Sequence, residues 1–406
     1  MMMQPKNYKP KTFSKMSAAI LFAVFILNFT SCTEEIDFKT ETFESALVVQ
    51  ASLTNENAPQ KVVLSRTFAF EDDGPPPESN ATVTIIDDLN TTYEFQETEN
   101  LGTYLSLTPF AASVGRQYTL NITTANGRTY QSAAVTLKAG TEIDQIYAQR
   151  STNGENVDGV SIFLDSYDAT NNSKYYRFEY EETYKIVSKF SSSRTFHVDE
   201  NNRISLVQKT EEEKICYNTL ESNNISLANT STFAEDRLTR FSVRFLDARS
   251  PKIGKRYSIL VRQYVISREA YTFYETLRNF SSSESLFSQV QPGFIAGNIQ
   301  STQNNNEKVI GIFDVATVSE RRLFFNFEDL FFDGSQPGEF AGGCEESRPS
   351  IESLPSLIND NAVRFYFLAS PDDPPELGEG PYYVMPRACI DCRAFGSNEV
   401  PDFWEE

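Results

Sequence analysis

Four cysteines in the second half of the chain carry the most reactive side chains of the sequence: Cys216, Cys344, Cys389 and Cys392. Cys389 and Cys392 form a C-x-x-C pair, a spacing typical of thioredoxin-like redox sites and of half a zinc site. No βαβ pattern accompanies the pair, which weakens the redox interpretation. An even number of cysteines in an exported chain predicts two structural disulfides, with three connectivities open.

The chain contains a single histidine, His197, and this limits the catalytic chemistry. Zinc sites that need two or three histidines are excluded, and a Ser-His-Asp triad would depend on His197 alone. We expect this residue on a strand edge or in a hairpin. The sequence has neither a G-x-S-x-G elbow nor a phosphate-binding glycine loop. Paired carboxylates of the glycosidase type remain open, but no catalytic residue, metal ligand or cofactor is predicted.

A fifth cysteine, Cys32, follows a leader with the features of a secretory signal. Four lysines precede an apolar run from about Ala18 to Leu27, and small residues precede the cysteine. A run of roughly ten residues is too short to span a bilayer as a helix. We interpret Cys32 as the acylated first residue of a bacterial lipoprotein, with residues 1–31 as its signal peptide and 32–45 as an acidic tether. A plain secretory signal is the alternative.

Acidic residues bear on where the protein acts and on what it binds. Glu34, Glu35 and Asp37 resemble the export signal that carries lipoproteins of the Bacteroidota to the outer leaflet, with a solvated tether as the alternative. The formal net charge is −20, which opposes binding to nucleic acid or to anionic membrane surfaces. We therefore expect a lipid anchor in the outer membrane, with the protein facing the cell exterior.

Short β-rich segments separated by turns fill residues 46–137. The expected strands lie at 46–53, 61–64, 81–86, 92–95, 102–105, 117–123 and 129–132. The last two are joined by a turn that contains Asn126 and Gly127, and Asn-Gly is the strongest short hairpin signal. Several short strands at this spacing predict an immunoglobulin-like β-sandwich.

A larger β-rich domain is predicted over residues 144–406, joined to the first by a hinge at 138–143. Strands at 160–164 and 174–186 flank a polar turn, a pattern that predicts a hairpin. From about residue 331 the chain is a loop-rich tail that contains three of the four later cysteines. The predicted fold class is mostly β: the immunoglobulin-like sandwich, then a larger sandwich-type domain with a disulfide-stapled tail.

Two segments of this second domain show a clear periodicity. Aromatic side chains at alternate positions of the 174–186 strand predict a core face opposite a solvated face, with a ligand platform as the alternative. One helix is predicted near residues 268–280, with Ser267 as its N-cap and apolar residues along one side. We expect this helix to pack on the second sandwich.

Several segments together resemble one protein family. They are Cys32 with the acids behind it, residues 46–51, 81–85, 174–178 and 291–299, and the ending Cys389-Ile-Asp-Cys392-Arg…Pro401-Asp-Phe-Trp404. The chain resembles, nearly end to end, the Bacteroidota lipoproteins that share domain of unknown function 4249. Members of that family are commonly encoded beside TonB-dependent outer-membrane transporters. The resemblance therefore implies a surface lipoprotein that partners such a transporter, and it supplies no catalytic residues.

Three functions are compatible with these features. The first is a non-enzymatic binding or accessory lipoprotein that works with a TonB-dependent transporter in nutrient uptake. The second is a surface glycan-processing hydrolase with paired carboxylates in a cleft of the second domain. The third is an adhesion or envelope-scaffold lipoprotein, for which an immunoglobulin-like module is equally suitable. The sequence does not identify the ligand.

Overall fold

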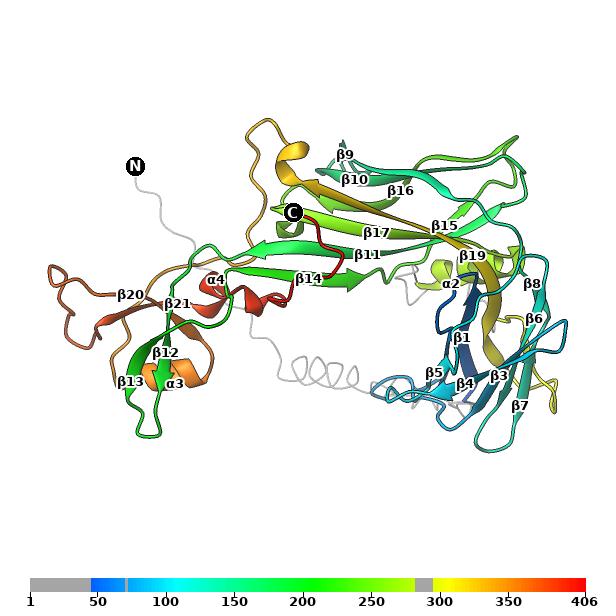
Figure 1. Cartoon of the computed structure of the whole chain (residues 1–406), viewed down its shortest axis with the longest axis horizontal. Coiled ribbons are helices and arrows are strands. Elements are labelled where there is room, and N and C mark those ends of the chain that lie inside the picture. Colours follow the sequence, from blue (N-terminus) through cyan, green and yellow to red (C-terminus); the bar gives the residue numbers. More distant parts are fainter. Residues whose placement is uncertain (1–44, 70–71, 282–294) are drawn as a thin grey trace, which may run out of the picture. The chain divides into compact units, whose positions relative to one another are not determined.

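The computed structural model describes residues 45–69, 72–281 and 295–406. The predicted lipidation site Cys32 and the predicted export residues Glu34, Glu35 and Asp37 lie outside these residues. Ser45–Glu406 form one compact unit. As predicted, the described chain is mostly β with one main helix (Figure 1). None of its helices is long and apolar enough to cross a membrane.

The N-terminal strands match the sequence prediction closely. They are β1 (Leu47–Thr54), β2 (Lys61–Arg66), β3 (Thr82–Asp87), β4 (Thr92–Glu97), β5 (Thr103–Ser106), β6 (Gln117–Thr123), β7 (Thr129–Ser132) and β8 (Val135–Thr136). Their inward side chains, among them Leu64, Ile85 and Leu120, form one buried core. Gly127 closes the turn between β6 and β7 with a φ of +80°, a conformation that glycine adopts without strain.

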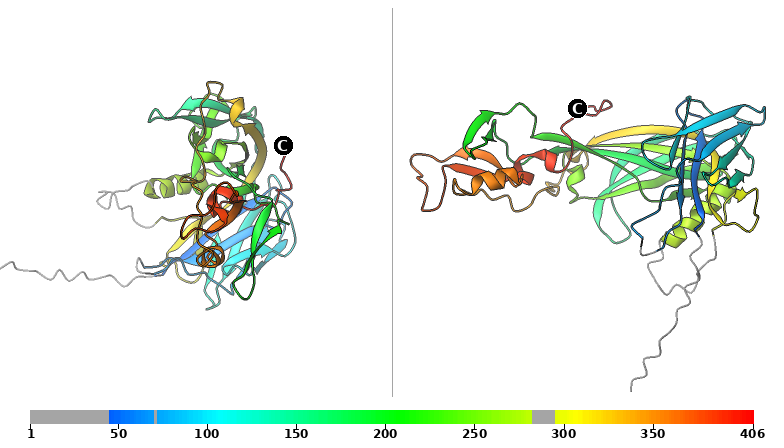
Figure 2. Two further views of the ribbon diagram at one scale, coloured as in Figure 1. Left: turned by 90° about the vertical axis from the view of Figure 1, so that its left-hand side faces the viewer. Right: turned by 90° about the horizontal axis from the view of Figure 1, so that it is seen from below.

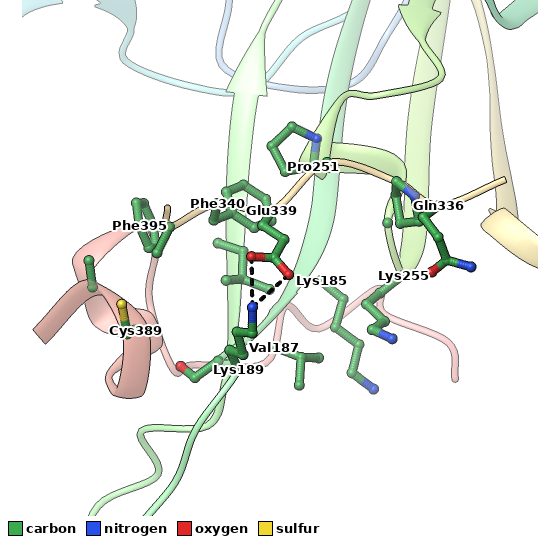
Figure 3. Close-up of a pocket in the computed structure, with 17 residues that line it drawn as sticks. Lys185, Val187, Lys189, Pro251, Lys255, Gln336, Glu339, Phe340, Cys389 and Phe395 are labelled. Carbon is green, nitrogen blue, oxygen red and sulfur yellow. Dashed lines mark hydrogen bonds and ion pairs between the residues drawn. The ribbon is translucent and has the colours of Figure 1, made fainter. Parts of the chain in front are cut away.

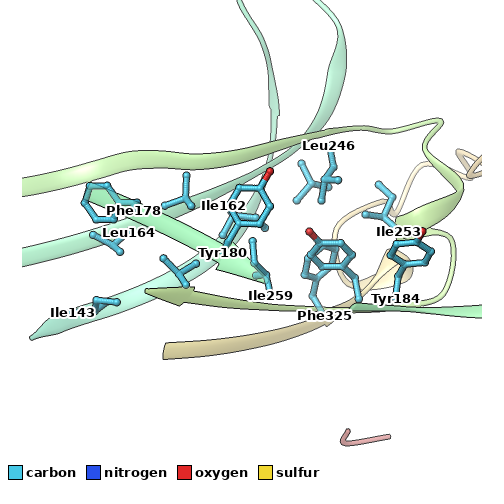
Figure 4. Packing of buried hydrophobic residues seen from close by; sticks show 14 of the residues in the cluster. Ile143, Ile162, Leu164, Phe178, Tyr180, Tyr184, Leu246, Ile253, Ile259 and Phe325 are labelled. Atoms are coloured by element: carbon cyan, nitrogen blue, oxygen red, sulfur yellow. The ribbon is translucent and has the colours of Figure 1, made fainter. Parts of the chain in front are cut away.

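Eleven further strands of the described chain precede the tail. They are β9 (Ile143–Thr152), β10 (Asp158–Asp168), β11 (Tyr175–Val187), β12 (Arg194–Val198), β13 (Ile204–Gln208), β14 (Ile215–Glu221), β15 (Ser226–Asn229), β16 (Asp236–Asp247), β17 (Arg256–Val265), β18 (Ile299–Ser301) and β19 (Val309–Asn326). A three-stranded sheet, β16-β10-β9, covers the strands β14-β11-β17-β19. Ile162 and Leu164 of β10 and Ile259 of β17 meet in the core between these layers (Figure 4).

The predicted hairpin between 160–164 and 174–186 is wrong. β10 pairs with β9 and β16, whereas β11 pairs with β14, β15 and β17. The polar turn therefore crosses from one sheet to the other, because both strands bury an apolar face in the same core from opposite sides. Asp168 fixes this corner by accepting hydrogen bonds from the backbone N–H groups of Thr170 (2.8 Å) and Ser173 (2.9 Å).

Strand β19 belongs to both cores. Its first half pairs in parallel with β1, from Val309 opposite Leu47 to Ala316 opposite Thr54. Its second half pairs antiparallel with β17, up to Asn326. Side chains of the first half enter the N-terminal core and those of the second half enter the sandwich core. The two cores are thus joined by one uninterrupted strand.

The segment predicted as a hinge lies against β19. A Cβ atom on Gly140 would come within 1.8 Å of the Thr317 hydroxyl, so only glycine fits at this approach. The Ser319 hydroxyl donates to Glu142 (2.9 Å) and accepts from the backbone N–H of Ile143 (2.9 Å). A domain boundary at 138–143 stays a prediction.

The aromatic face of β11 is a core face, as predicted, and it includes one carboxylate. Tyr176, Phe178 and Tyr184 are buried in the sandwich core. Glu182 shares this face and is 3% exposed. It accepts hydrogen bonds from the Tyr257 hydroxyl (2.6 Å) and the Lys252 ammonium (2.5 Å). Burial alone would raise the pKa of Glu182, but these contacts hold it below the usual value.

Helix α2 (Arg268–Ser281) confirms the predicted helix. The Ser267 hydroxyl accepts a hydrogen bond from the backbone N–H of Ala270 at 3.0 Å, which is the N-cap contact expected from the sequence. The buried side chains of Ala270 and Phe273 pack against Ile312 and Ala316 of β19. The helix therefore covers the outer face of the central strands, on the side opposite the sandwich core.

The four later cysteines form two disulfides, which confirms that prediction and settles the connectivity. Cys216 on β14 pairs with Cys392, with 5.5 Å between the Cα atoms, and Cys344 pairs with Cys389, with 5.7 Å. The two cysteines of the C-x-x-C motif thus have different partners. All four sulfur atoms are used in disulfides, so none is left as a thiolate that could bind zinc.

The tail is a small module that the Cys216–Cys392 bond ties to β14 and that the Cys344–Cys389 bond closes within itself. It contains α3 (Leu354–Asn359), β20 (Val363–Leu368), β21 (Tyr382–Pro386) and α4 (Arg387–Ile390). Phe196 of β12 makes an edge contact with Phe365 of β20, with 5.4 Å between ring centroids. The hairpin β12–β13 and the tail therefore gather at one end of the central strands (Figures 1 and 2).

Asp391, between the two cysteines of the C-x-x-C motif, is the charged centre of this module. Its fully buried carboxylate is held by Arg393 (2.9 Å), Arg364 (3.0 Å) and Arg387 (3.5 Å). Burial alone would raise its pKa, but the hydrogen bonds and charges of these arginines lower it to about 2. The carboxylate therefore stabilises the tail at neutral pH, and this contribution is lost as the pH falls from about 4 towards 2.

We predict that Asp391→Asn lowers the free energy of unfolding by about 3 kcal/mol, because Arg364 and Arg387 lose their buried counter-ion and Arg393 loses one of its partners. Urea unfolding and limited proteolysis of the tail would measure the loss. Asp372→Asn, at an exposed position in the same tail, is the matched control. Equal stability of the two variants would contradict the role of Asp391.

Candidate functional site

The structure places His197 away from any obvious catalytic arrangement. It is exposed on β12, opposite Ser205 of β13, in the hairpin that the sequence predicted. The four later cysteines are structural. Within the described ranges, no group of three or more His, Cys, Asp or Glu residues is arranged to hold a metal ion. A candidate site must therefore be sought among the cavities.

A large cleft lies beside helix α2, and we call it the α2 cleft. It encloses about 770 Å³ and is bounded by α2, by the outer face of β11 and β17, and by β1 with the first half of β19. Cavities of about 300–1,000 Å³ are typical of small-molecule sites. Three apolar side chains of α2, Phe273, Tyr274 and Leu277, form one wall. The cleft thus combines aromatic surface with a polar floor.

A stacked arginine forms the end of the cleft nearest the helix. The Arg177 guanidinium lies over the ring of Tyr264, 4.2 Å from its centroid, and 5.2 Å from that of Tyr274. Arg177 also forms an ion pair with Glu179, which accepts a hydrogen bond from the Tyr264 hydroxyl at 2.8 Å. Burial and the neighbouring carboxylate raise the pKa of Tyr264 well above its ordinary value. Tyr264 is therefore a neutral hydrogen-bond donor at physiological pH.

Two charged residues of the cleft floor, Glu181 and Arg262, each form an ion pair with a residue of β19. Glu181 of β11 pairs with Arg322 of β19 at 3.0 Å, and Arg262 of β17 pairs with Glu320 at 3.2 Å. These ion pairs give the cleft a charged floor beside its aromatic wall.

The sequence analysis missed this cleft. It predicted a solvated outer face for the 174–186 strand, because Arg177, Glu179 and Glu181 alternate with core aromatics there. Nothing in that pattern shows that α2 and β1 will come to lie beside the face. The signal that could have found the cleft is the match between these charges and those at alternate positions of β17 and β19.

Asp314 is a buried ionisable residue that the sequence analysis also did not predict. It lies within the apolar first half of β19, is 1% exposed, and faces the N-terminus of α2. One carboxylate oxygen accepts a hydrogen bond from the backbone N–H of Ser267 at 3.4 Å, and the other has no partner among the described residues. Burial raises the pKa of Asp314, although this contact and the charge of Arg177 act in the opposite direction.

We predict that Asp314→Asn raises the melting temperature at pH 8 and that the gain shrinks as the pH falls towards 4. Because the folded-state pKa is raised, the carboxyl group favours folding while protonated, and that contribution is lost as the pH rises through the folded-state pKa. The amide of the Asp314→Asn variant does not ionise, so its contribution to stability does not fall as the pH rises. Thermal unfolding at several pH values would test this, with exposed Asp144→Asn as the control. A gain that is independent of pH would contradict it.

Comparison with known proteins places the chain in a family. A family profile described as Domain of unknown function (DUF4249) matches residues 33–322, which include α2 and most of β19. No curated protein matches the chain. The profile covers well over half of the sequence, so this protein belongs to the family described as Domain of unknown function (DUF4249).

Proposed function

We propose that this protein is an outer-membrane lipoprotein, exposed on the cell surface, that acts as a non-enzymatic binding or accessory subunit of a TonB-dependent transporter in nutrient uptake. The α2 cleft is the observation that carries the binding part of the proposal. Cys32 behind a secretory leader, and the acids that follow it, support the lipid anchor. The resemblance to Bacteroidota lipoproteins encoded beside such transporters supports the partner.

The chemistry of the cleft favours binding over turnover. Two of its carboxylates, Glu179 and Glu181, form ion pairs with arginines, which gives the cleft fixed charges that a polar ligand can meet. Aromatic side chains on one wall and charged groups on the floor are the usual composition of a ligand site. A ligand held here would be presented to the transporter without being cleaved.

The tail supplies a surface on which a partner could dock. Four large apolar side chains are exposed in or near the β20–β21 hairpin: Ile351 (53%), Phe367 (38%), Leu368 (49%) and Leu377 (107%). Exposed apolar side chains that lie near one another mark interaction surfaces more often than scattered ones do. The tail hairpin is therefore the first place to test for contact with the transporter.

Affinity capture of the tagged, native lipoprotein from detergent-solubilised outer membrane would test the proposal. We predict that a TonB-dependent barrel is recovered in a stoichiometric amount, as identified by mass spectrometry. The double variant Leu368→Ser/Leu377→Ser should reduce recovery of the barrel at least severalfold, because it removes apolar contact area. The matched control is Leu89→Ser/Leu101→Ser, which changes two exposed leucines in turns of the N-terminal strands.

Recovery of the lipoprotein alone would contradict the accessory role. Equal loss of the barrel with both double variants would contradict the tail as the docking surface. Release of sugar from surface glycans by the purified protein would instead favour the hydrolase alternative.

A further inference from the structure

A second cavity lies where the tail meets the central strands, away from α2, and we call it the basic pocket (Figure 3). It encloses about 470 Å³. One side is formed by β11 and the residues that follow it, and the other by residues 336–341. Cys389 also lines the pocket, and its disulfide to Cys344 holds this part of the tail in place.

The charge of the basic pocket is opposite to that of the chain. Its lining includes Lys185, Lys189 and Lys255 against a single carboxylate, Glu339, although the whole chain has a formal net charge of −20. An acidic protein repels small anions in general. A local excess of ammonium groups therefore indicates a place where an anion can bind. Figure 3 shows Lys189 directed at Glu339, whereas Lys185 and Lys255 extend away from that pair.

Two of the lysines already hold carboxylates of the protein itself. Lys189 pairs with Glu339 at 3.0 Å, and Lys185 binds both carboxylate oxygens of Glu406, at 2.7 and 2.8 Å. Both glutamates are more than half exposed, so each is free to move away. The exposed Lys255 forms no ion pair within the part of the chain that the structure describes. The pocket thus has one unpaired ammonium group and two with displaceable partners.

Aromatic side chains give the pocket an apolar wall. Phe340 and Phe395 lie with their ring centroids 5.5 Å apart, and Phe340 stacks on Tyr184 of the sandwich core at 5.6 Å. These rings are held by the core and by the tail, so they offer a surface that is fixed before a ligand arrives. Ammonium groups beside fixed aromatic rings suit a molecule with a charged end and an apolar body.

We propose that the basic pocket binds a small organic carboxylate, with its anionic group at Lys255, Lys185 and Lys189 and its apolar body against Phe340 and Phe395. Lysine is a compact, strongly charged donor that suits carboxylates without demanding bidentate geometry. This site is separate from the α2 cleft and does not depend on the transporter partnership.

Fluorine NMR on the full chain in a non-ionic detergent would test the site with two matched probes. The anionic probe is 4-fluorobenzoate and its neutral counterpart is 4-fluorobenzamide, with empty micelles as the blank. We expect the benzoate signal to broaden and shift on addition of protein, and the benzamide signal to change much less. Equal responses of the two probes, or no response to millimolar benzoate, would overturn the proposal.

Three variants locate the effect. Lys255→Gln should weaken benzoate binding roughly three- to fivefold, the range expected for one solvent-accessible ion pair. Glu339→Gln should strengthen it by a similar factor, because the competing carboxylate is removed from Lys189. Lys138→Gln changes an exposed lysine before β9 and should leave binding unchanged. A weakening by Lys138→Gln equal to that by Lys255→Gln would show a general charge effect and would overturn the assignment.

Discussion

The structure depends on the double pairing of β19. A strand that pairs in parallel with β1 and then antiparallel with β17 joins the strands of both cores into one sheet and fixes their directions. The Asn298 side chain contributes by exchanging two hydrogen bonds with the backbone of Phe313, at 2.8 and 2.9 Å, before the pairing of β19 with β17 begins. A Cβ atom on Gly297 would collide with the carbonyl of Gly311, so the close approach requires glycine. Because β19 is shared, α2 can cover it and the α2 cleft can form beside it.

Successive side chains of β11 point to opposite faces of the sheet, and this decides whether each charged residue is buried in the core or lines the cleft. Side chains of one parity enter the sandwich core, where Glu182 is retained only because Lys252, Tyr257 and Arg244 surround it. Side chains of the other parity form the cleft floor, where Glu181 is more exposed to solvent than Glu182 is. The same residue type is thus a buried ion on one face and a partly exposed one on the other.

Local features of this fold follow from the sequence, and distant pairings do not. Periodicity located β1 to β7, the aromatic face of β11 and helix α2 with its cap at Ser267, because these depend on neighbours within a few residues. The cysteine count predicted two disulfides but could not pair Cys216 with Cys392. The turn after β10 was misread, since a polar turn between apolar strands looks the same whether the strands share a sheet or face each other. Both cavities were missed because each needs elements that are far apart in sequence.

Strand β19 is made late in synthesis, and this limits when β1 can pair with it. Asn55, at the end of β1, accepts a hydrogen bond from the backbone of Val318, 263 residues later. At typical synthesis rates, the first strand waits for on the order of tens of seconds before its partner has been made. During that interval β1 has an open edge, which is the feature that recruits wrong partners. The pairing of β1 with β19 therefore forms only after most of the chain has been made.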